Sequence, residues 1–534
     1  MQNKKRFFFD AGLKKIQPVV DKLLILVILA GLSACSLTPD LTKMTDRKSI
    51  SYSRIAKDSS RLGQYVNQLP ETEPEHSGVS VLKNGMDAFL ARALLIKAAD
   101  DSLDLQYYIW KDDATGRIIL SLLLEAADRG VRIRLLIDDV NTAGKDQGIL
   151  TLHQHPNIEV RLFNPFYSRS SRLWSFLTDF NRLNHRMHNK LFIADGKIAI
   201  LGGRNIGDEY FDASKNVEFS DLDLFAVGPV VGQSGRSFDD FWNSPAAVPA
   251  DALIALPTNL AEFQKQLNLY RDQQSQTSYA IELRQRSLFD DLLNHQVQWF
   301  WGEGKILADQ TSKINSPSDE SRFLATQLRQ HINDIRDSLL IISPYFVPND
   351  VFMNTLDELV SRGVKISVLT NSLTSTDVSI VHAGYQKYRH RLLQMGVNLY
   401  ELKPASSNRK KVKKHQRLKD IGGSSRASLH AKIYIFDTRR LFTGSLNLDP
   451  RSVYINTEIG LLMDNPLLAA EFEKRFFEEI EDDAYRLELD DHQKINWITR
   501  DKGEPRVFTR EPGLNPFKAL GMWFISLFPI EEQL

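Results

Sequence analysis

Apolar runs alternate with amphipathic stretches along most of the chain, in an order that predicts an α/β fold. Apolar residues at helical spacing indicate amphipathic helices, and short, nearly continuous apolar runs are typical of buried strands. In the first half, helices are expected at residues 86–100 and 115–130, and strands at 102–110, 131–139 and 158–166. Gly130 stands where the second of these helices has to end.

The second half repeats this order of helices and strands. Helices are expected at residues 321–337 and 352–363, and strands at 338–347, 364–372 and 397–404. Asp101-Ser102-Leu103 returns as Asp337-Ser338-Leu339 at the start of the corresponding strand. We therefore predict two duplicated α/β halves, each a mixed sheet flanked by helices, related by a pseudo-two-fold axis.

Changes in composition divide the chain into five parts. They are a signal peptide (1–35), a tether (36–75), the first half (76–254), a connector (255–315) and the second half (316–534). The connector is polar and largely helical, and we expect it to pack on the first half. Residues 466–489 are expected to form one long helix. The apolar segment 515–530 holds Trp523 and is either an interfacial membrane segment or a helix that docks on the core.

The first 35 residues have the pattern of a targeting segment. Lysines and an arginine precede the apolar run 23–32, which is too short to cross a bilayer comfortably. The run ends in Leu32-Ser33-Ala34-Cys35, which resembles the lipobox of bacterial lipoproteins. The resemblance implies cleavage before Cys35, a diacylglycerol on its thiol, and a membrane-anchored lipoprotein at the periplasmic face. The alternative is an uncleaved signal anchor.

Overall composition excludes several classes of protein. The 67 basic residues balance the 67 acidic residues, so net charge does not recruit nucleic acid or an anionic membrane. Cys35 is the single cysteine, which excludes an intramolecular disulfide and a cysteine metal cluster. The content of 42% apolar and 25% charged residues is that of a globular protein.

One short motif occurs twice, with every matching position 242 residues apart. Both copies follow the pattern His-x-Lys-x4-Asp-x6-Gly-(Gly/Ser)-x-Asn. The first copy consists of His188, Lys190, Asp195, Gly202, Gly203 and Asn205, and the second of His430, Lys432, Asp437, Gly444, Ser445 and Asn447. Such a duplication rarely arises by chance, so we predict one site between the halves.

The residue types of the motif suit a phosphodiester. If the two copies meet, their lysines and asparagines surround the non-bridging oxygens with positive charge and N–H donors. Of the two histidines, one can attack phosphorus and form a phosphohistidine, while the other donates and accepts the proton. Asp195 and Asp437 fall on the opposite strand face, so within this catalytic motif we expect them to support the site from a buried position.

Each histidine requires a partner that fixes its tautomer. Asp221 and Glu458 each stand eight residues before a proline, in matching surroundings. We assign Asp221 to His188, with Asp223 as a second candidate, and Glu458 to His430. The alternative for either carboxylate alone is an ordinary charge at a strand end.

Metal catalysis is the competing interpretation of the motif. Two histidines with carboxylates could ligate zinc, but both copies place a lysine, which is a poor ligand at neutral pH, beside the histidine. We therefore expect neither a metal nor another cofactor. Two buried histidines without a chemical role would explain one copy, but not a duplicate of six positions.

These residues identify a resemblance to the phospholipase D superfamily. The segments DLQYYIWKDDATGR, RGVRIRLLIDD, NHRMHNK and LGGRNIGDEYF are most similar to its cardiolipin synthase C group, over roughly residues 80–530. The resemblance implies a phosphohistidine mechanism without metal, with His188 as the nucleophile. Gly203 departs from it, because many members have serine there; Ser445 supplies the corresponding hydroxyl in the second copy.

Three local features favour a lipid substrate over a nucleic acid. They are the expected anchor at Cys35, the apolar segment 515–530, and the sequence at 171–183, which offers an aromatic wall just before His188. Seven of the eleven residues at 409–419 are basic, which suits anionic head groups, nucleic acid or a solvated loop alike.

The resemblance and these features together predict a cardiolipin synthase. Its substrates would be phospholipids, with phosphatidylglycerol as acceptor and either phosphatidylglycerol or phosphatidylethanolamine as donor, and no nucleic acid is expected as a partner. A hydrolytic phospholipase D that releases phosphatidic acid is the first alternative, followed by a nuclease of the same superfamily. A lipid-binding scaffold without activity is the alternative from another class.

Overall fold

The strands of the two halves follow the same order. The computed structural model describes residues 48–70, 73–82, 84–214, 218–315, 320–404, 427–501 and 504–514. In the first half, neighbouring strands run in the order β1-β8-β6-β5-β2-β3-β4-β9, and in the second half in the order β10-β17-β16-β15-β11-β12-β13-β18. In the first half β2, β3 and β4 pair in parallel, and in the second half β11, β12 and β13 do the same. The other neighbours in these two orders pair antiparallel. The predicted pair of mixed sheets is confirmed.

The strands are short, and most are buried. Those of the first half are β1 (His76–Leu82), β2 (Ser102–Tyr107), β3 (Arg132–Asp138), β4 (Ile158–Phe163), β5 (Leu191–Ala194), β6 (Ile198–Gly202), β7 (Glu218–Ser220), β8 (Asp223–Val227) and β9 (Ala247–Pro249). Those of the second are β10 (Phe300–Ala308), β11 (Ser338–Ile342), β12 (Lys365–Asn371), β13 (Asn398–Leu402), β14 (Ala427–Leu429), β15 (Ile433–Phe436), β16 (Arg440–Gly444), β17 (Ile459–Asp464) and β18 (Ala484–Leu489). The strands β19 (Ile495–Asp501) and β20 (Glu504–Phe508) extend the second sheet beyond β18.

Helices cover both faces of each sheet. The longer ones are α4 (Gly85–Ala98), α5 (Ala114–Asp128), α9 (Pro229–Trp242), α11 (Leu260–Gln274), α15 (Leu324–Asn333), α16 (Asp350–Ser361) and α20 (Pro466–Asp483). The side chain of Asp113 accepts a hydrogen bond from the backbone N–H of Gly116 and begins α5. Gly130 follows the end of α5 with a φ of +96°, a conformation that favours glycine.

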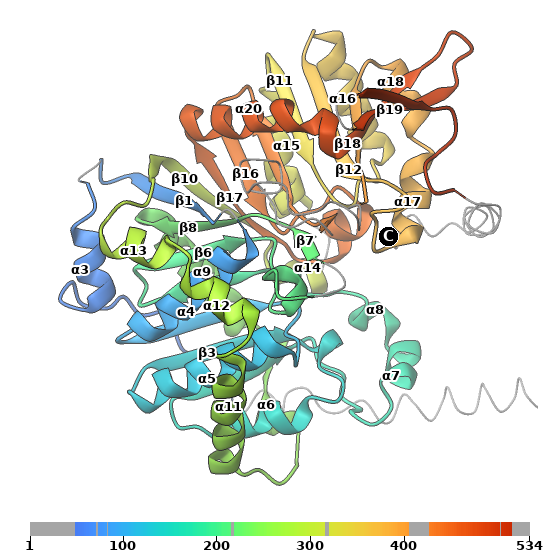
Figure 1. Cartoon of the computed structure of the whole chain (residues 1–534). Helices are drawn as coiled ribbons and strands as arrows, with labels where there is room; N and C mark the ends of the chain where they lie inside the picture. Colours follow the sequence, from blue (N-terminus) through green and yellow to red (C-terminus); the bar gives the residue numbers. More distant parts are fainter. Residues whose placement is uncertain are drawn as a thin grey trace, which may run out of the picture.

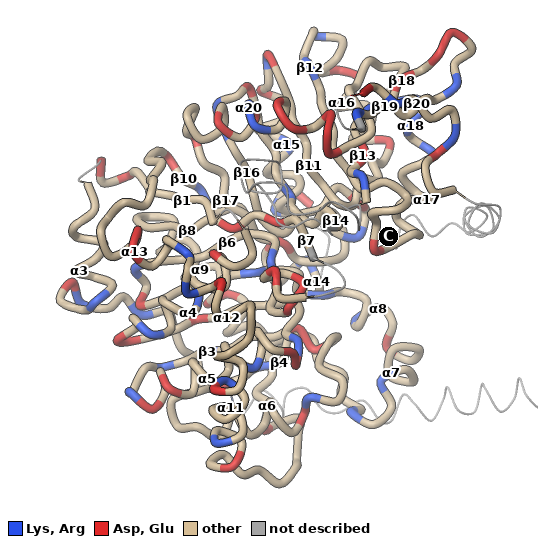
Figure 2. The backbone as a smooth tube through the Cα atoms, in the orientation of Figure 1, with Lys and Arg blue, Asp and Glu red and all other residues tan. Residues whose placement is uncertain are grey.

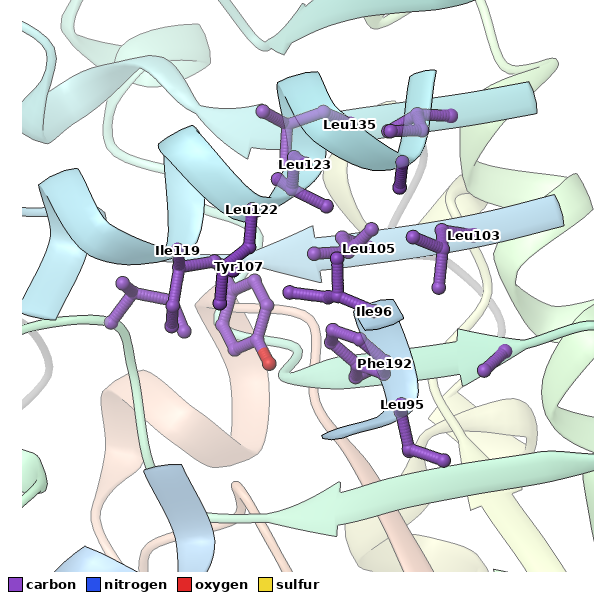
Figure 3. Close-up of a cluster of buried hydrophobic side chains, with 14 of the residues drawn as sticks. Leu95, Ile96, Leu103, Leu105, Tyr107, Ile119, Leu122, Leu123, Leu135 and Phe192 are labelled. Atoms are coloured by element: carbon purple, nitrogen blue, oxygen red, sulfur yellow. The ribbon is translucent and has the colours of Figure 1, made fainter. Parts of the chain in front are cut away.

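The outer core of the first half lies between its sheet and the helices α4 and α5. Figure 3 shows Ile96 of α4 beside Leu105 on β2 and Phe192 on β5, and Leu122 of α5 beside Tyr107 on β2. Alternate residues of the same strands, such as Leu136 on β3 and Ile193 on β5, face the other way into a second core. This alternation is the reason why these strands read as continuous apolar runs in the sequence.

The second core joins the two halves. It contains residues of both sheets together with the inner face of α9, which packs on the first sheet, and the inner face of α20, which packs on the second. The strands β1 and β10 pair antiparallel, so the two sheets are continuous along their edges. Figure 1 shows the first half, in blue and green, against the second half, in yellow and red. The halves therefore form one body, with each motif at the junction.

Two expectations about the connecting segments change in the structure. The predicted long helix over 466–489 ends at Asp483, because residues 484–489 form β18 and pair with β13. The connector contains α11, α12 (Ser278–Arg284) and α13 (Leu288–Leu293), of which α11 packs on α5 and α13 on α4; it also contains β10, which bridges both sheets. In the described residues, no helix has both the length and the apolar composition needed to cross a bilayer.

Candidate active site

The two motifs begin where the halves meet. His188 and Lys190 stand just before β5, and His430 and Lys432 stand just before β15. The backbone N–H of His188 donates to the carbonyl of Thr457 at 2.9 Å, and that of His430 donates to the carbonyl of Ser220 at 2.8 Å. Each motif is thus held by the backbone of the other half. The reciprocal contacts are those expected from a pseudo-two-fold axis.

The carboxylates pair with the histidines across this axis. Nδ1 of His188 lies 2.9 Å from Oε2 of Glu458, and Nδ1 of His430 lies 2.5 Å from Oδ2 of Asp221. The assignment of Asp221 to His188 and of Glu458 to His430 is therefore wrong. Asp223 is no partner of His188 either, because its carboxylate pairs with Arg92 at 2.8 Å.

The strand order gives the reason for the crossed pairing. Within the first sheet, β6 lies between β5, which follows His188, and β8, which follows Asp221. Two strand spacings separate them by about 9.5 Å, too far for a hydrogen bond. The facing half brings Glu458 within reach instead.

Burial in this junction favours the neutral form of His188. Burial and the adjacent Lys190 ammonium lower the pKa of His188 well below its ordinary value. Burial also raises the pKa of Glu458 to about 7, against the opposing charge of Lys190. When Glu458 is ionised, Nδ1–H of His188 donates to it, and Nε2 keeps its lone pair. This is the form of imidazole that can attack phosphorus.

The second pair has a different electrostatic balance. Burial and Lys432 lower the pKa of His430, while the ionised Asp221 opposes that change. Burial alone would raise the pKa of Asp221, but His430 and Lys432 lower it to about 2. Asp221 is therefore ionised at neutral pH and stabilises a proton on His430. This balance suits a general acid and base.

The two lysines lie with the histidines in the same junction. Nζ of Lys190 donates to the carbonyl of His188 at 2.5 Å, and Nζ of Lys432 donates to the carbonyl of His430. Lys432 also lowers the pKa of His188, and Lys190 that of His430, so the charges of both halves act on one site. Burial lowers the pKa of both lysines. A bound phosphodiester anion would favour their charged forms.

Gly203 differs from Ser445 because of the carboxylate beside it. A Cβ placed at Gly203 would collide with the carboxylate of Asp221. In the second half, the hydroxyl of Ser445 accepts from the N–H of Ile459 at 2.9 Å and donates to its carbonyl at 3.2 Å. The carboxylate of Asp221 therefore leaves no room for a side chain at position 203, and glycine is the residue that fits there. The hydroxyl of Ser445 holds the start of β17, rather than standing free for substrate.

The aspartates of the two motifs hold the fold. The carboxylate of Asp195 accepts hydrogen bonds from the backbone N–H groups of Asp100, Asp101 and Ser102, at the turn before β2. Asp437 makes the same contacts with residues 336–338 before β11. These carboxylates tie β5 to β2 and β15 to β11. They position the motif and make no hydrogen bond to either histidine.

The two asparagines share their carboxamides between the fold and the site. Oδ1 of Asn205 accepts from the N–H of Ile109 at 3.1 Å, and its Nδ2 donates to the hydroxyl of Tyr210 at 3.0 Å. Nδ2 of Asn447 donates to the hydroxyl of Ser452 at 3.4 Å. Since a carboxamide nitrogen carries two hydrogens, each asparagine retains one N–H for a ligand.

Several aromatic residues of the site were not predicted from the sequence. The ring of Tyr108 meets that of His188 edge-on at 5.0 Å, and Nζ of Lys190 lies 5.4 Å from the Tyr108 ring centre. On the other side, Tyr210 and Phe219 pack against His430 at 5.4 and 4.9 Å. The position of Tyr108 at the carboxyl end of β2, beside the motif strand, is the one signal that could have indicated it.

A buried ionic cluster supports Glu458 from behind. Oδ2 of Asp309 accepts from the backbone N–H of Glu458 and from Nζ of Lys313, each at 2.9 Å. Burial raises the pKa of Asp309 to about 6 and that of nearby Asp449 to about 7. Across the described ranges, no three His, Cys, Asp or Glu side chains are arranged to hold a metal ion. Cys35, the basic stretch 409–419 and the segment 515–530 lie outside the described residues.

Comparisons with known proteins agree with this geometry. A family described as "Cardiolipin synthase, PLD-like domain" matches residues 93–223 and 328–480, which contain both histidine motifs. Cardiolipin synthase C of Escherichia coli K12 is 39% identical over 89% of this chain and 100% of its own length. Cardiolipin synthase of Clostridium perfringens is 23% identical over 76% of this chain and 70% of its own length.

A solved structure shows the same fold. Phosphatidylserine synthase of Haemophilus influenzae aligns with 90% of this chain and 100% of its own, at a TM-score of 0.54 and 14% identity. The family match covers more than half of the chain and the identity to cardiolipin synthase C extends over nearly all of it. The chain therefore belongs to the cardiolipin synthase family with phospholipase D-like domains.

Proposed function

We propose that this protein is a cardiolipin synthase that transfers a phosphatidyl group through a phosphohistidine. The observation that carries the proposal is the two-histidine site with crossed carboxylates, in a chain 39% identical to cardiolipin synthase C. The donor is a phospholipid, either phosphatidylglycerol or phosphatidylethanolamine. The acceptor is the glycerol hydroxyl of a second phosphatidylglycerol.

In the first step, Nε2 of His188 attacks the phosphorus of the donor. The bond from phosphorus to the head-group oxygen breaks, and His430 gives its proton to that oxygen. The negative charges of Asp221 and of the bound phosphodiester favour the protonated form of His430 against the effect of burial. Glycerol leaves if the donor is phosphatidylglycerol, and ethanolamine leaves if it is phosphatidylethanolamine. Lys190 and Lys432, with the free N–H groups of Asn205 and Asn447, stabilise the charge on the phosphoryl oxygens.

In the second step, the acceptor hydroxyl attacks the phosphohistidine. His430, now neutral, takes the hydroxyl proton, and the bond between phosphorus and His188 breaks. Asp221 stabilises the imidazolium that forms on His430, and Glu458 holds the Nδ1 proton of His188 throughout. Cardiolipin is released and the starting protonation states are restored.

The enclosure of the site favours an alcohol acceptor over water. His188 and His430 expose 9% and 7% of their surfaces, and both carboxylates are fully buried. Aromatic rings cover each histidine from one side. A phosphohistidine in these surroundings meets little bulk water, so an acceptor that is bound beside it reacts first.

The membrane location is part of the same proposal. We infer that Cys35 carries a diacylglycerol and anchors the protein to a membrane at the periplasmic face, which brings the site to its lipid substrates. A Cys35→Ala variant should then remain in the soluble fraction or keep its signal peptide, and mass spectrometry of the mature N-terminus distinguishes these outcomes.

Lipid profiling of a bacterial strain that makes no cardiolipin tests the activity. The wild-type protein should restore cardiolipin, whereas His188→Ala and His430→Ala, each shown to be folded, should not. Phosphatidic acid in place of cardiolipin would establish hydrolysis. The absence of both lipids would contradict a lipid-directed activity. Treatment of the purified protein with a chelator should leave the activity unchanged.

A further inference from the structure

A short helical segment with exposed apolar side chains lies next to the active site. It consists of α7 (Arg172–Thr178) and α8 (Phe180–Leu183), called here the α7–α8 segment. Leu173, Trp174 and Leu177 expose 75%, 50% and 67% of their surfaces. Their spacing places them on one side of α7, and no residue of α7 is buried. The sequence interpretation of this segment as a wall of the site is not what the structure shows.

The apolar side of α7 carries no charge. Residues 173–178 are Leu-Trp-Ser-Phe-Leu-Thr, and Figure 2 shows this part of α7 without Lys, Arg, Asp or Glu. The segment is nevertheless fixed at its base, where Arg172 donates to the carbonyl of Asp139 and the hydroxyl of Thr142, each at 2.9 Å. Exposure of these apolar residues is therefore a feature of a well-anchored element. Contiguous exposed apolar residues of this kind mark an interaction site.

The α7–α8 segment has a fixed position relative to His188. Leu183, at the end of α8, is buried and stands five residues before His188, which limits their separation to about 18 Å. Between them, Nδ1 of His185 lies 2.9 Å from the carbonyl of Ile455 in the other half. The exposed face of α7 is thus held at the His188 side of the junction.

The described chain ends against the loop that follows β12. Gly513 packs against Thr374, in the loop that follows β12. At the start of that loop, the side chain of Asn371 accepts from the N–H of Leu429 and donates to its carbonyl, each at 3.0 Å, and Leu429 directly precedes His430. Residues 515–530, which are apolar with one lysine, continue from this point. In Figure 1, α17 (Ser379–Gln386), which follows the same loop, and the α7–α8 segment lie on one side of the molecule.

We propose that the α7–α8 segment inserts Leu173, Trp174 and Leu177 into the interfacial region of a phospholipid bilayer and so presents the site to lipids in that bilayer. The proposal rests on the proposed function for the identity of the ligand. The exposed apolar side of α7, on the His188 side of the junction, defines the face that meets the membrane. Leucine and tryptophan without intervening charge are the composition of an interfacial helix.

Bromine-labelled lipids test the insertion without reference to catalysis. The full chain is mixed with phosphatidylglycerol and phosphatidylethanolamine vesicles whose acyl chains carry bromine, which quenches nearby tryptophans. Brominated lipid should quench less fluorescence in Trp174→Phe than in the wild type, because this variant lacks the one of the seven tryptophans that lies on α7. Trp301→Phe, which removes a tryptophan of β10, should show no such loss of quenching. Equal quenching in wild type and Trp174→Phe would overturn the proposal, and a protein partner would then be the better explanation of the exposed face.

A second comparison separates insertion from a role in folding. Leu173→Ser/Leu177→Ser should reduce turnover of vesicle lipid by about tenfold or more, since two leucines leave the bilayer, and should keep turnover of short-chain phosphatidylglycerol below its micelle concentration. The control Leu293→Ser/Leu467→Ser removes leucines of similar exposure, 62% and 76%. It should change the turnover of neither vesicle lipid nor short-chain phosphatidylglycerol. Equal losses on both substrates would overturn the proposal. A wild type inactive on both would overturn the proposed function alone, while quenching still decides the insertion.

Discussion

Oε2 of Glu458 lies 2.9 Å from Nδ1 of His188, although 270 residues and the junction between the halves separate them. Asp221 and His430 form the corresponding pair in the opposite direction. Each histidine therefore has its backbone in one half and its orienting carboxylate in the other. It follows that neither half alone contains a complete histidine–carboxylate pair, which ties activity to correct association of the two halves.

The crossed pairs predict different defects for the two carboxylate variants. With a phosphatidyl ester of p-nitrophenol, whose leaving group needs no acid, Glu458→Gln should slow the burst of p-nitrophenol by roughly 10²–10³-fold, because His188 loses its proton acceptor. Asp221→Asn should keep the burst and slow the turnover that follows, because His430 must still activate the acceptor. Rapid-mixing absorbance measurements give both phases.

The same experiment distinguishes which histidine is the nucleophile. Denaturation with detergent at mildly alkaline pH, where the P–N bond survives, should leave the phosphatidyl group on His188 in the Asp221→Asn variant, where mass spectrometry of peptides detects it. If Asp221→Asn removed the burst and Glu458→Gln preserved it, the roles of His188 and His430 would be exchanged.

Sequence reasoning found the chemistry of the site but not its connectivity. Periodicity predicted the repeated helices and strands because each is a local pattern, and the 242-residue repeat identified the histidines and lysines. The pairing of Asp221 and Glu458 depends on which half faces which, and that is fixed by the shared core and the β1–β10 edge. Neither feature has a local sequence signal.

The aromatic residues around the histidines were missed for a related reason. Tyr108 follows a buried strand, where an aromatic residue is ordinary, and only tertiary packing brings it to His188. Residues 484–489 continue the amphipathic pattern of α20, but the unpaired edge of β13 takes them up as a strand. Tertiary contacts override local propensity at both places.

The contact between Gly203 and Asp221 predicts an asymmetry between the motifs. Gly203→Ser should displace the carboxylate of Asp221 and lower kcat by about 10²-fold or more, because His430 loses its stabilising charge. Ser445→Gly removes a hydroxyl bound to Ile459 and should have a smaller effect. Steady-state kinetics with melting temperatures of both variants test this. Full activity of Gly203→Ser would contradict the proposed need for a small residue beside Asp221.

The hydrogen bonds of Asp195 predict a loss of stability rather than of chemistry. Asp195→Ala leaves three backbone N–H groups without their acceptor and should lower the free energy of unfolding by about 3 kcal/mol. Asp437→Ala should cost less, because Asp437 is half-buried. Denaturant titration measures both changes, and the folded fraction should keep most of its kcat. A stable Asp195→Ala protein without activity would instead place this carboxylate among the reacting groups.

The raised pKa of Glu458 predicts how the first step depends on pH. Burial raises this pKa to about 7, so protonated Glu458 predominates below pH 7 and cannot accept the Nδ1 proton of His188. The burst rate should therefore increase as the pH rises through about 7. Glu458→Gln should remove this rise from the residual burst, whereas Asp449→Asn, which removes a neighbouring acid whose pKa burial also raises to about 7, should retain it. A rise that persists in Glu458→Gln would assign the titration to another group. The imidazole of His188 is not the source of this rise, because its lowered pKa leaves it already neutral in this range.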